Sequence, residues 1–157
     1  MLLRIAELAP RFESTLLSNS MKTASQPARH QSLAGVRLRK HADYGRAYAA
    51  GRKRQSASMS WFLAPQVPGS AAGPRVGLTV GKKLGKAHER NHIKRRMREA
   101  LRRNIELLPH GYDLIFHPRR SVLTMDYAIL EAEVARILRQ AVAETVRASA
   151  ALAGTAK

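Results

Sequence analysis

The segment Leu84–Arg103 constrains the fold most, because it combines a helical apolar stripe with a dense array of positive charges. Its polar side chains form two rows. The first row is Asn91, Arg95, Arg98 and Arg102, and the second is His92, Arg96, Glu99 and Arg103. The pattern predicts a helix that packs one side on a core and presents a cationic side to a partner. The apolar residues recur at steps of three and four along this segment and just beyond it: Ile93, Met97, Ala100, Leu101, Ile105 and Leu108.

Positive charge is concentrated in the middle of the chain. Of the 157 residues, 28 are Lys or Arg and 11 are Asp or Glu. Residues 37–103 hold 18 basic and 3 acidic residues, whereas residues 1–36 hold 4 and 2, and residues 104–157 hold 6 and 6. A merely solvated charged face usually mixes its signs, but Glu99 is the single acid among the helix arginines. This localisation predicts a polyanion-binding surface, and nucleic acid is the commonest such partner.

Composition excludes several other classes of function. The chain has no cysteine, which excludes disulfides, thiolate catalysis and cysteine-ligated zinc. No apolar run approaches the ~20 residues of a transmembrane helix, and Arg4 and Glu7 interrupt any signal-peptide core. The basic helix carries no Trp or Phe, so we expect no membrane-surface binding. We expect a soluble, cytoplasmic protein.

We expect one folded domain at residues 37–147, between a disordered N-terminal extension at 1–36 and a flexible tail at 148–157. From Ser18 onward the residues of the extension are mostly polar or small. Met21 is a second possible initiator methionine.

Within the domain, alternation and apolar runs predict strands at 56–64, 75–80 and 112–117. The last of them is predicted to be buried, which suits a strand parallel to the second. Thr124 is the expected N-cap of a final helix with Asp126 in its first turn. The predicted core stripe of that helix is Tyr127, Leu130, Val134, Ile137, Leu138, Ala141 and Val146.

A short helix is predicted to end near Ala50, with Gly51 after it. Tyr44 and Tyr48 lie on one face of it, at i and i+4. Either core packing or a stacking platform for bases explains this pair equally well.

The ordered residues of the basic segment resemble the signature of the bacterial ribonuclease P protein component, an Arg-Asn-Arg core followed by x-Lys-Arg. This chain departs from it at His92, where the family has Arg; histidine still donates to phosphate but is only partly charged near its reference pKa of ~6.5. The similarity covers residues 37–140. The matching positions are Leu84, Ala87, Arg90, Asn91, Ile93, Lys94, Arg95, Met97 and Arg98, flanked by Arg37–Lys40, Asp43-Tyr44, Arg75–Leu78 with Lys82-Lys83, and Tyr112–His117.

The resemblance implies an α+β fold, a compact α-β-β-β-α-β-α sandwich with a four-stranded sheet and a left-handed β-α-β crossover around the basic helix. It implies the protein subunit of ribonuclease P, an endoribonuclease that removes the 5′ leader of precursor tRNA. In that family the catalyst is an RNA with bound Mg²⁺, so no catalytic residue and no metal ligand is expected here. The implied partners are ribonuclease P RNA and precursor tRNA, with no obligate protein partner.

The resemblance also implies two sets of site residues. Contacts with the catalytic RNA would come from the basic helix: Arg90, Asn91, His92, Lys94, Arg95, Arg98 and Arg102. A cleft for the leader, between the first helix and the sheet, would use Tyr44, Tyr48, Phe62, Lys82 and Lys83.

Two other functional classes compete with this one. Residues His88–His92 match H-E-x-x-H, which in zinc proteases supplies two neutral imidazoles and a Glu base. The surrounding cations, among them Lys86, Arg90 and Lys94, would oppose a dication there. A non-enzymatic RNA-binding protein, such as a ribosomal protein, fits the charge and size equally well, and only the ordered signature separates it from the ribonuclease P subunit.

Overall fold

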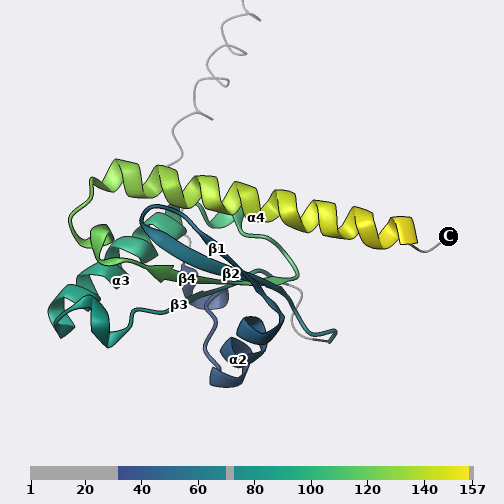
Figure 1. Ribbon diagram of the computed structural model, residues 1–157, viewed down its shortest axis with the longest axis horizontal. Coiled ribbons are helices and arrows are strands. Elements are labelled where there is room, and N and C mark those ends of the chain that lie inside the picture. Colours follow the sequence, from purple (N-terminus) through teal and green to yellow (C-terminus); the bar gives the residue numbers. More distant parts are fainter. Residues whose placement is uncertain (1–31, 70–72, 156–157) are drawn as a thin grey trace, which may run out of the picture. The chain divides into compact units, whose positions relative to one another are not determined.

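The computed structural model describes residues 32–69 and 73–155. The helices and strands follow the order expected from the resemblance, α-β-β-β-α-β-α (Figure 1). They are α2 (His41–Ala50), β1 (Arg52–Gln55), β2 (Met59–Pro65), β3 (Arg75–Leu78), α3 (Ala87–Arg103), β4 (Tyr112–Pro118) and α4 (Tyr127–Thr155). Short 3₁₀ turns lie between them: η1 (Leu33–Gly35), η2 (Lys82–Leu84), η3 (Ile105–Leu107) and η4 (Arg120–Leu123).

The four strands form one sheet in the order β1-β2-β4-β3. β2 is antiparallel to both β1 and β4, whereas β3 is parallel to β4. The parallel pairing predicted for the last two strands is therefore confirmed. The chain travels from β3 to β4 through α3, which makes this unit a β-α-β crossover.

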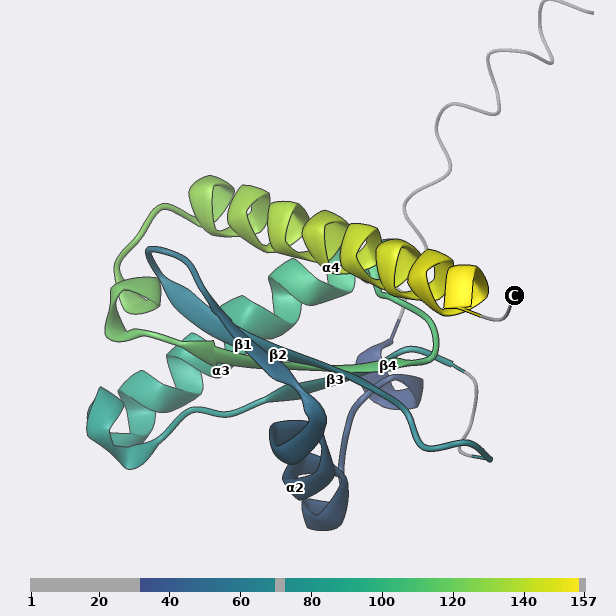
Figure 2. The ribbon, with the colours of Figure 1, turned by 45° about the vertical axis from the view of Figure 1, so that its right-hand side comes forward.

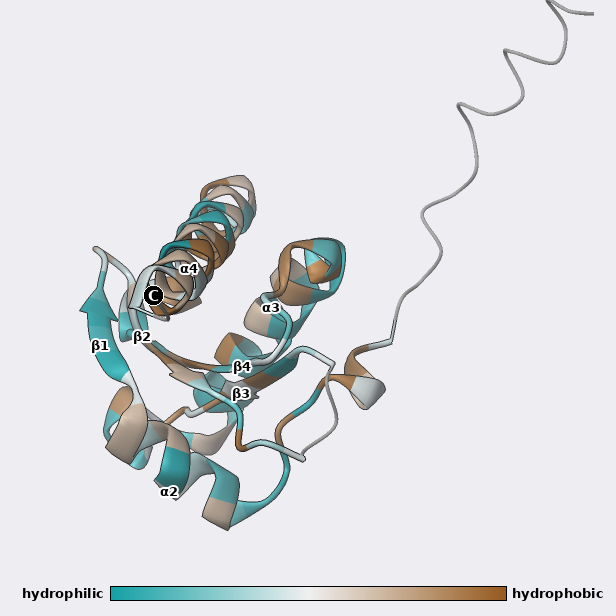
Figure 3. Ribbon diagram, turned by 90° about the vertical axis from the view of Figure 1, so that its right-hand side faces the viewer, coloured by the Kyte–Doolittle hydropathy of each residue, from teal (hydrophilic) through white to brown (hydrophobic). Residues whose placement is uncertain are grey.

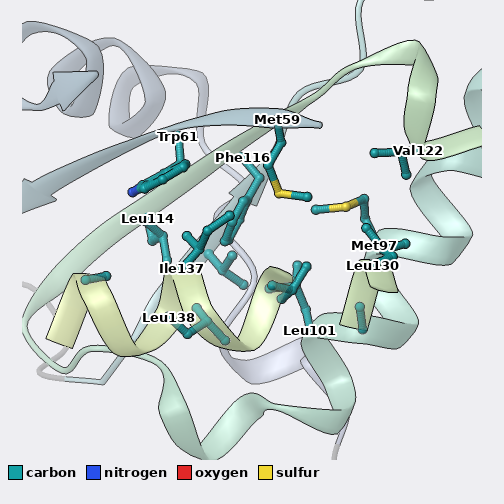
Figure 4. Packing of buried hydrophobic residues seen from close by; sticks show 14 of the residues in the cluster. Met59, Trp61, Met97, Leu101, Leu114, Phe116, Val122, Leu130, Ile137 and Leu138 are labelled. Atoms are coloured by element: carbon teal, nitrogen blue, oxygen red, sulfur yellow. The ribbon is translucent and has the colours of Figure 1, made fainter. Parts of the chain in front are cut away.

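Helices cover both faces of the sheet, α3 and α4 on one side and α2 on the other (Figures 2 and 3). The larger core lies on the α3 and α4 side and includes Trp61, Phe116 and Met97 (Figure 4). A smaller core lies under α2 and includes Ile115. Because successive side chains of a strand point to opposite faces, Ile115 and Phe116 belong to different cores. The central strand β4 thus supports both layers.

The basic helix begins three residues later than its sequence pattern predicts. Gly85 has a φ of 137°, a conformation that side-chain-bearing residues rarely adopt, so helix geometry starts beyond it. Lys86 occupies the N-cap position, and its backbone N–H donates to the carboxylate of Glu89 at 2.7 Å. The predicted stripe is confirmed, since Ile93, Met97, Ala100 and Leu101 are all buried.

The last helix differs from expectation at both ends. Thr124 was wrong as its N-cap; Asp126 accepts a hydrogen bond from the N–H of Ala128 at 2.8 Å and fills that role. The core stripe is correct as far as Ala141, but Val146 is exposed. Helical residues continue to Thr155, so residues 148–155 of the expected tail are exposed helix, and its last turns run past the strands (Figure 1). Within the described residues, neither α4 nor any other helix is long and apolar enough to cross a membrane.

Strand β1 is absent from the pattern-based prediction, which placed one strand at 56–64. The structure instead forms a β1–β2 hairpin that turns at Ser56–Ser58. β1 is an edge strand with the sequence Arg-Lys-Arg-Gln, and its residues are mostly exposed. A strand without a buried face shows no apolar alternation, so periodicity does not reveal it.

An N-terminal arm, defined as residues 32–38, leads into α2 along the open edge of β3. The N–H of Val76 donates to the carbonyl of Val36 at 2.7 Å, and the N–H of Leu38 donates to the carbonyl of Val76 at 2.8 Å. Leu33 and Val36 pack against the larger core. Residues 32–36 of the expected disordered extension thus belong to the folded domain, and residues 1–31 lie outside the described residues.

A buried ion-pair network holds α2 on the sheet. Arg75 of β3 donates two hydrogen bonds of 2.7 Å to Asp113 of β4 and one of 3.4 Å to Asp43 of α2. Asp43 also accepts from Arg46. Both aspartates are buried, so losing Arg75 would leave uncompensated charge. The network therefore sets the position of α2 over β3 and β4.

Gly77 of β3 allows the ring of Tyr44 to lie against the strand. A Cβ atom at residue 77 would come within 2.8 Å of that ring. Gly77→Ala should therefore lower the free energy of unfolding by about 1–3 kcal/mol, measured by urea denaturation. Gly45→Ala, on α2 in open space, is the control and should raise it by about 0.5–1 kcal/mol. Wild-type stability of Gly77→Ala would contradict the close packing.

Candidate nucleic-acid interface

The burial of the apolar stripe turns the remaining side chains of α3 outward. Arg95, Arg98, Asn91 and His92 are exposed, whereas Arg90 and Lys94 are half-buried beside the stripe. All of these positions were predicted to contact RNA. The helix therefore brings them together on its solvent side, as its period requires.

Four of these cations have no acidic partner within the described part of the chain: Arg90, Lys94, Arg95 and Arg98. Cations concentrated on one face, without carboxylates between them, repel one another and attract polyanions. We call these four residues the α3 cationic face. Their arrangement suits phosphate groups spaced along a nucleic-acid backbone.

The opposite flank of α3 uses its arginines within the protein. Arg96 donates to the backbone carbonyls of Val122 and Met125, which anchors α3 to the segment before α4. Arg103 lies 5.4 Å from the ring centroid of Tyr127 on α4, a cation–π contact. These arginines were indistinguishable from the cationic face by sequence, because only tertiary contacts separate the two groups.

Glu99 offsets the charge of Arg102, the last predicted RNA contact. Arg102 donates to both carboxylate oxygens of Glu99, at 3.0 and 2.6 Å. The hydrogen bond from Arg102 lowers the pKa of Glu99 below its ordinary value of 4.5. Arg102 is thus less available to a phosphate than Arg95 or Arg98, and its RNA contact stays a prediction.

The zinc-site pattern at His88–His92 has a structural explanation. Glu89 accepts the N-capping hydrogen bond from Lys86 and a second bond from Arg120 at 3.2 Å. The capping bond from the Lys86 backbone lowers the pKa of Glu89. Throughout residues 32–69 and 73–155, no three His, Cys, Asp or Glu side chains gather in a way that could hold a metal ion.

A second cluster of candidate side chains lies between α2 and the sheet. We define this aromatic cluster as Tyr48, Phe62 and His117. The ring centroid of Tyr48 lies 5.0 Å from that of Phe62 and 5.5 Å from that of His117, and Phe62 and His117 are also 5.5 Å apart. All three are half-buried. The arrangement presents π-faces at a partly open surface, where nucleobases could stack.

Hydrogen bonds fix the tyrosine of this cluster. The hydroxyl of Tyr48 lies 2.9 Å from Nε2 of His117 and 3.1 Å from the hydroxyl of Thr79. Tyr44 lies further along α2, with its hydroxyl donating to the carbonyl of Leu38 at 3.4 Å. Both tyrosines pack against the smaller core, so their packing role is confirmed, and base stacking stays a prediction.

Sequence reasoning missed His117 and Thr79. The position of His117, two residues after the buried Ile115, places it on the α2 face of β4. The predicted cleft residues Lys82 and Lys83 are exposed in η2, which begins three residues after Thr79. The two-residue period of a strand could have found His117. Once Ile115 is assigned to the face under α2, residue 117 must lie on the same face.

The comparisons with known proteins agree on one family. The family model described as Ribonuclease P matches residues 34–142. The ribonuclease P protein component of Chloroflexus aggregans is 41% identical over 106 residues, a match covering 67% of this chain and 76% of the relative. That of Thermobifida fusca is 35% identical over 108 residues, covering 66% and 74% respectively.

Solved structures of the same family share the fold. The Staphylococcus aureus RNase P protein has a TM-score of 0.58 at 26% identity, covering 68% of this chain and 94% of its own. The Thermotoga maritima RNase P protein has a TM-score of 0.58 at 27% identity, covering 66% and 96%. The matched part therefore corresponds to nearly the whole of each solved protein.

The environment of His117 gives a prediction for its titration. Burial, followed by the charge of Lys53, lowers the pKa of His117 below its ordinary value of 6.5. The folded protein then binds fewer protons than the unfolded chain as pH falls through 6.5, so this residue removes stability there. NMR titration of the His117 ring should give a midpoint below 6.5, and a midpoint at or above 6.5 would contradict the packing described.

Proposed function

Since the chain belongs to the family of ribonuclease P protein components, we propose that it is the protein subunit of a ribonuclease P. In this role it binds the catalytic RNA and the 5′ leader of precursor tRNA, and assists removal of that leader to give the mature tRNA 5′ end. The observation that carries the proposal is the α3 cationic face, four cations without acidic partners among the described residues. Its proposed partners are ribonuclease P RNA and precursor tRNA, met in the cytoplasm.

The catalytic RNA binds along α3 in this proposal. Lys and Arg at phosphates release condensed counterions, which gives strong, sequence-independent and salt-sensitive affinity. Arg95 and Arg98 are exposed and a turn apart, so both can reach one backbone without rearrangement of the helix. Asn91 and His92 add further hydrogen-bond donors beside them.

The 5′ leader lies along the surface between α2 and the sheet. Unpaired bases stack on aromatic side chains without being read by sequence, as a leader of variable sequence demands. Phe62 and His117 offer such faces, and hydrogen bonds to the Tyr48 hydroxyl hold the cluster in place. Lys82 and Lys83 supply exposed charge for the leader phosphates.

Cleavage itself is assigned to the RNA subunit, which holds Mg²⁺. Packing many phosphates together opposes both RNA folding and the approach of substrate, and a cationic protein surface reduces that repulsion. Less self-repulsion lets the RNA assemble at a lower Mg²⁺ concentration. We assign no catalytic residue to this chain.

The double variant Arg95→Ala/Arg98→Ala tests the α3 face. Each lost phosphate contact should reduce the slope of log K against log salt by about 0.7–0.9, so the pair should reduce it by roughly 1.5 and weaken RNA binding. Filter binding to ribonuclease P RNA across a salt series measures both quantities. Arg139→Ala/Arg147→Ala removes the same charge from exposed positions of α4 and should change the slope less. Equal slopes for the two double variants would refute the assigned face.

The variant Phe62→Leu tests the leader surface. It keeps apolar bulk but removes a stacking face, so the holoenzyme should bind precursor tRNA about 5- to 100-fold more weakly, with mature tRNA unaffected. Fluorescence titration of the assembled holoenzyme with both RNAs measures the difference. Tyr112→Leu removes an aromatic ring from the other face of the sheet and is the matched control. An equal loss of affinity for precursor and mature tRNA would show that Phe62 only packs in the protein and does not bind the leader.

A further inference from the structure

A cavity of about 270 Å³ lies where the N-terminal arm, β3 and α3 meet, apart from the aromatic cluster. Its walls include Arg37, Arg39 and Arg98, the ring of Tyr44, and the side chains of Leu78 and Leu101. We propose that this cavity binds one unpaired nucleotide of an RNA, with the base inside and the phosphate at the arginines. The proposal rests on the RNA-binding function proposed above and adds a defined site to it.

The charges of the cavity favour an anion. Arg37 comes from the arm, Arg39 from the residues between the arm and α2, and Arg98 from α3, so the cations approach from separate segments. None of the three forms an ion pair with another of the described residues. Arg39 donates to the carbonyl of Ala34 at 3.4 Å, which leaves the other donors of its guanidinium for a ligand. Arginine is well suited to phosphate because its donors match phosphate oxygens in pairs.

The open edge of β3 supplies hydrogen-bonding groups for a base. The backbone N–H and carbonyl of Val76 form hydrogen bonds with the arm. The backbone N–H of Thr79 instead donates to the carbonyl of Phe116 on β4. Peptide groups two residues apart along a strand point to the same side, so those of Leu78 face outward like those of Val76. The arm leaves the edge before it reaches Leu78, since the carbonyl of Lys40 already accepts from the first turn of α2. A donor and an acceptor on the backbone therefore border the cavity.

The apolar part of the lining explains why a nucleotide fits better than a bare phosphate. Leu33, Val76 and Leu101 give apolar walls, and the Tyr44 ring gives an aromatic one. The volume is slightly below the ~300–1,000 Å³ of small-molecule sites, which limits the occupant to about one nucleotide. An apolar wall, an aromatic ring, an open strand edge and three arginines together match a base with its phosphate.

Ala34→Trp tests this assignment without changing any charge. Ala34 lines the cavity, so the indole should fill it, whereas Gly35→Trp places the same side chain on the same turn, outside the lining and in open space. Ala34→Trp should weaken RNA binding about 5- to 100-fold, the range for losing one stacked base, with the salt slope kept. Gly35→Trp should bind as wild type.

Two binding measurements identify the source of the nucleotide. Weaker binding of Ala34→Trp to ribonuclease P RNA alone assigns it to the catalytic RNA. Unchanged binding there, with weaker binding of precursor but not mature tRNA by the holoenzyme, assigns it to the leader. Wild-type affinity in both measurements overturns the cavity proposal while leaving the α3 face intact. Absence of salt-sensitive RNA binding in the wild-type protein would instead refute the proposed function itself.

A second measurement applies if Ala34→Trp has a lower melting temperature than Gly35→Trp. The wild-type protein is titrated with the four nucleoside monophosphates, and the backbone amide of Leu78 is followed by NMR. A saturable shift of this amide supports the site. An unchanged Leu78 signal overturns it.

Discussion

The buried stripe of α3 is the constraint on which the rest of the molecule depends. Ile93, Met97 and Leu101 fit the core against the sheet and α4, and this packing fixes the rotation of the helix about its axis. Once the rotation is fixed, the cations at other positions can only point to solvent or to neighbouring elements. Core packing thereby determines which arginines form the α3 cationic face and which, like Arg96, hold the fold together.

Strand β4 connects the two proposed RNA surfaces. Its side chains reach the core beneath α3 through Phe116, and the smaller core beneath α2 through Ile115. The Arg75 ion pairs add a polar connection, because Asp113 on β4 and Asp43 on α2 share one guanidinium. The surface beside α2 is therefore held in a fixed relation to α3, which the proposed contact with two RNAs requires. The cavity beside the arm lies at the edge of the same sheet.

The apolar pattern of the sequence predicted the elements that bury one face, whereas the other features depend on tertiary contacts. The stripe of α3 follows from apolar spacing and the buried centre of β4, residues 113–116, from an apolar run, so the sequence alone indicated both. Strand β1 carries Arg-Lys-Arg-Gln and pairs only because β2 lies beside it. The pairing of Arg102 with Glu99 depends on side-chain conformation. His117 entered the aromatic cluster through the register of β4, which single-sequence patterns do not specify.

Cleavage of a precursor tRNA at low Mg²⁺ concentration decides whether this chain acts as the protein subunit of a ribonuclease P. Release of the 5′ leader is followed over time in three reactions. They contain bacterial ribonuclease P RNA alone, this protein alone as the control, and the RNA together with the protein. We predict rapid cleavage only when the RNA and the protein are both present. An unchanged rate, together with tight and salt-sensitive RNA binding, would contradict it and would indicate a general RNA-binding protein.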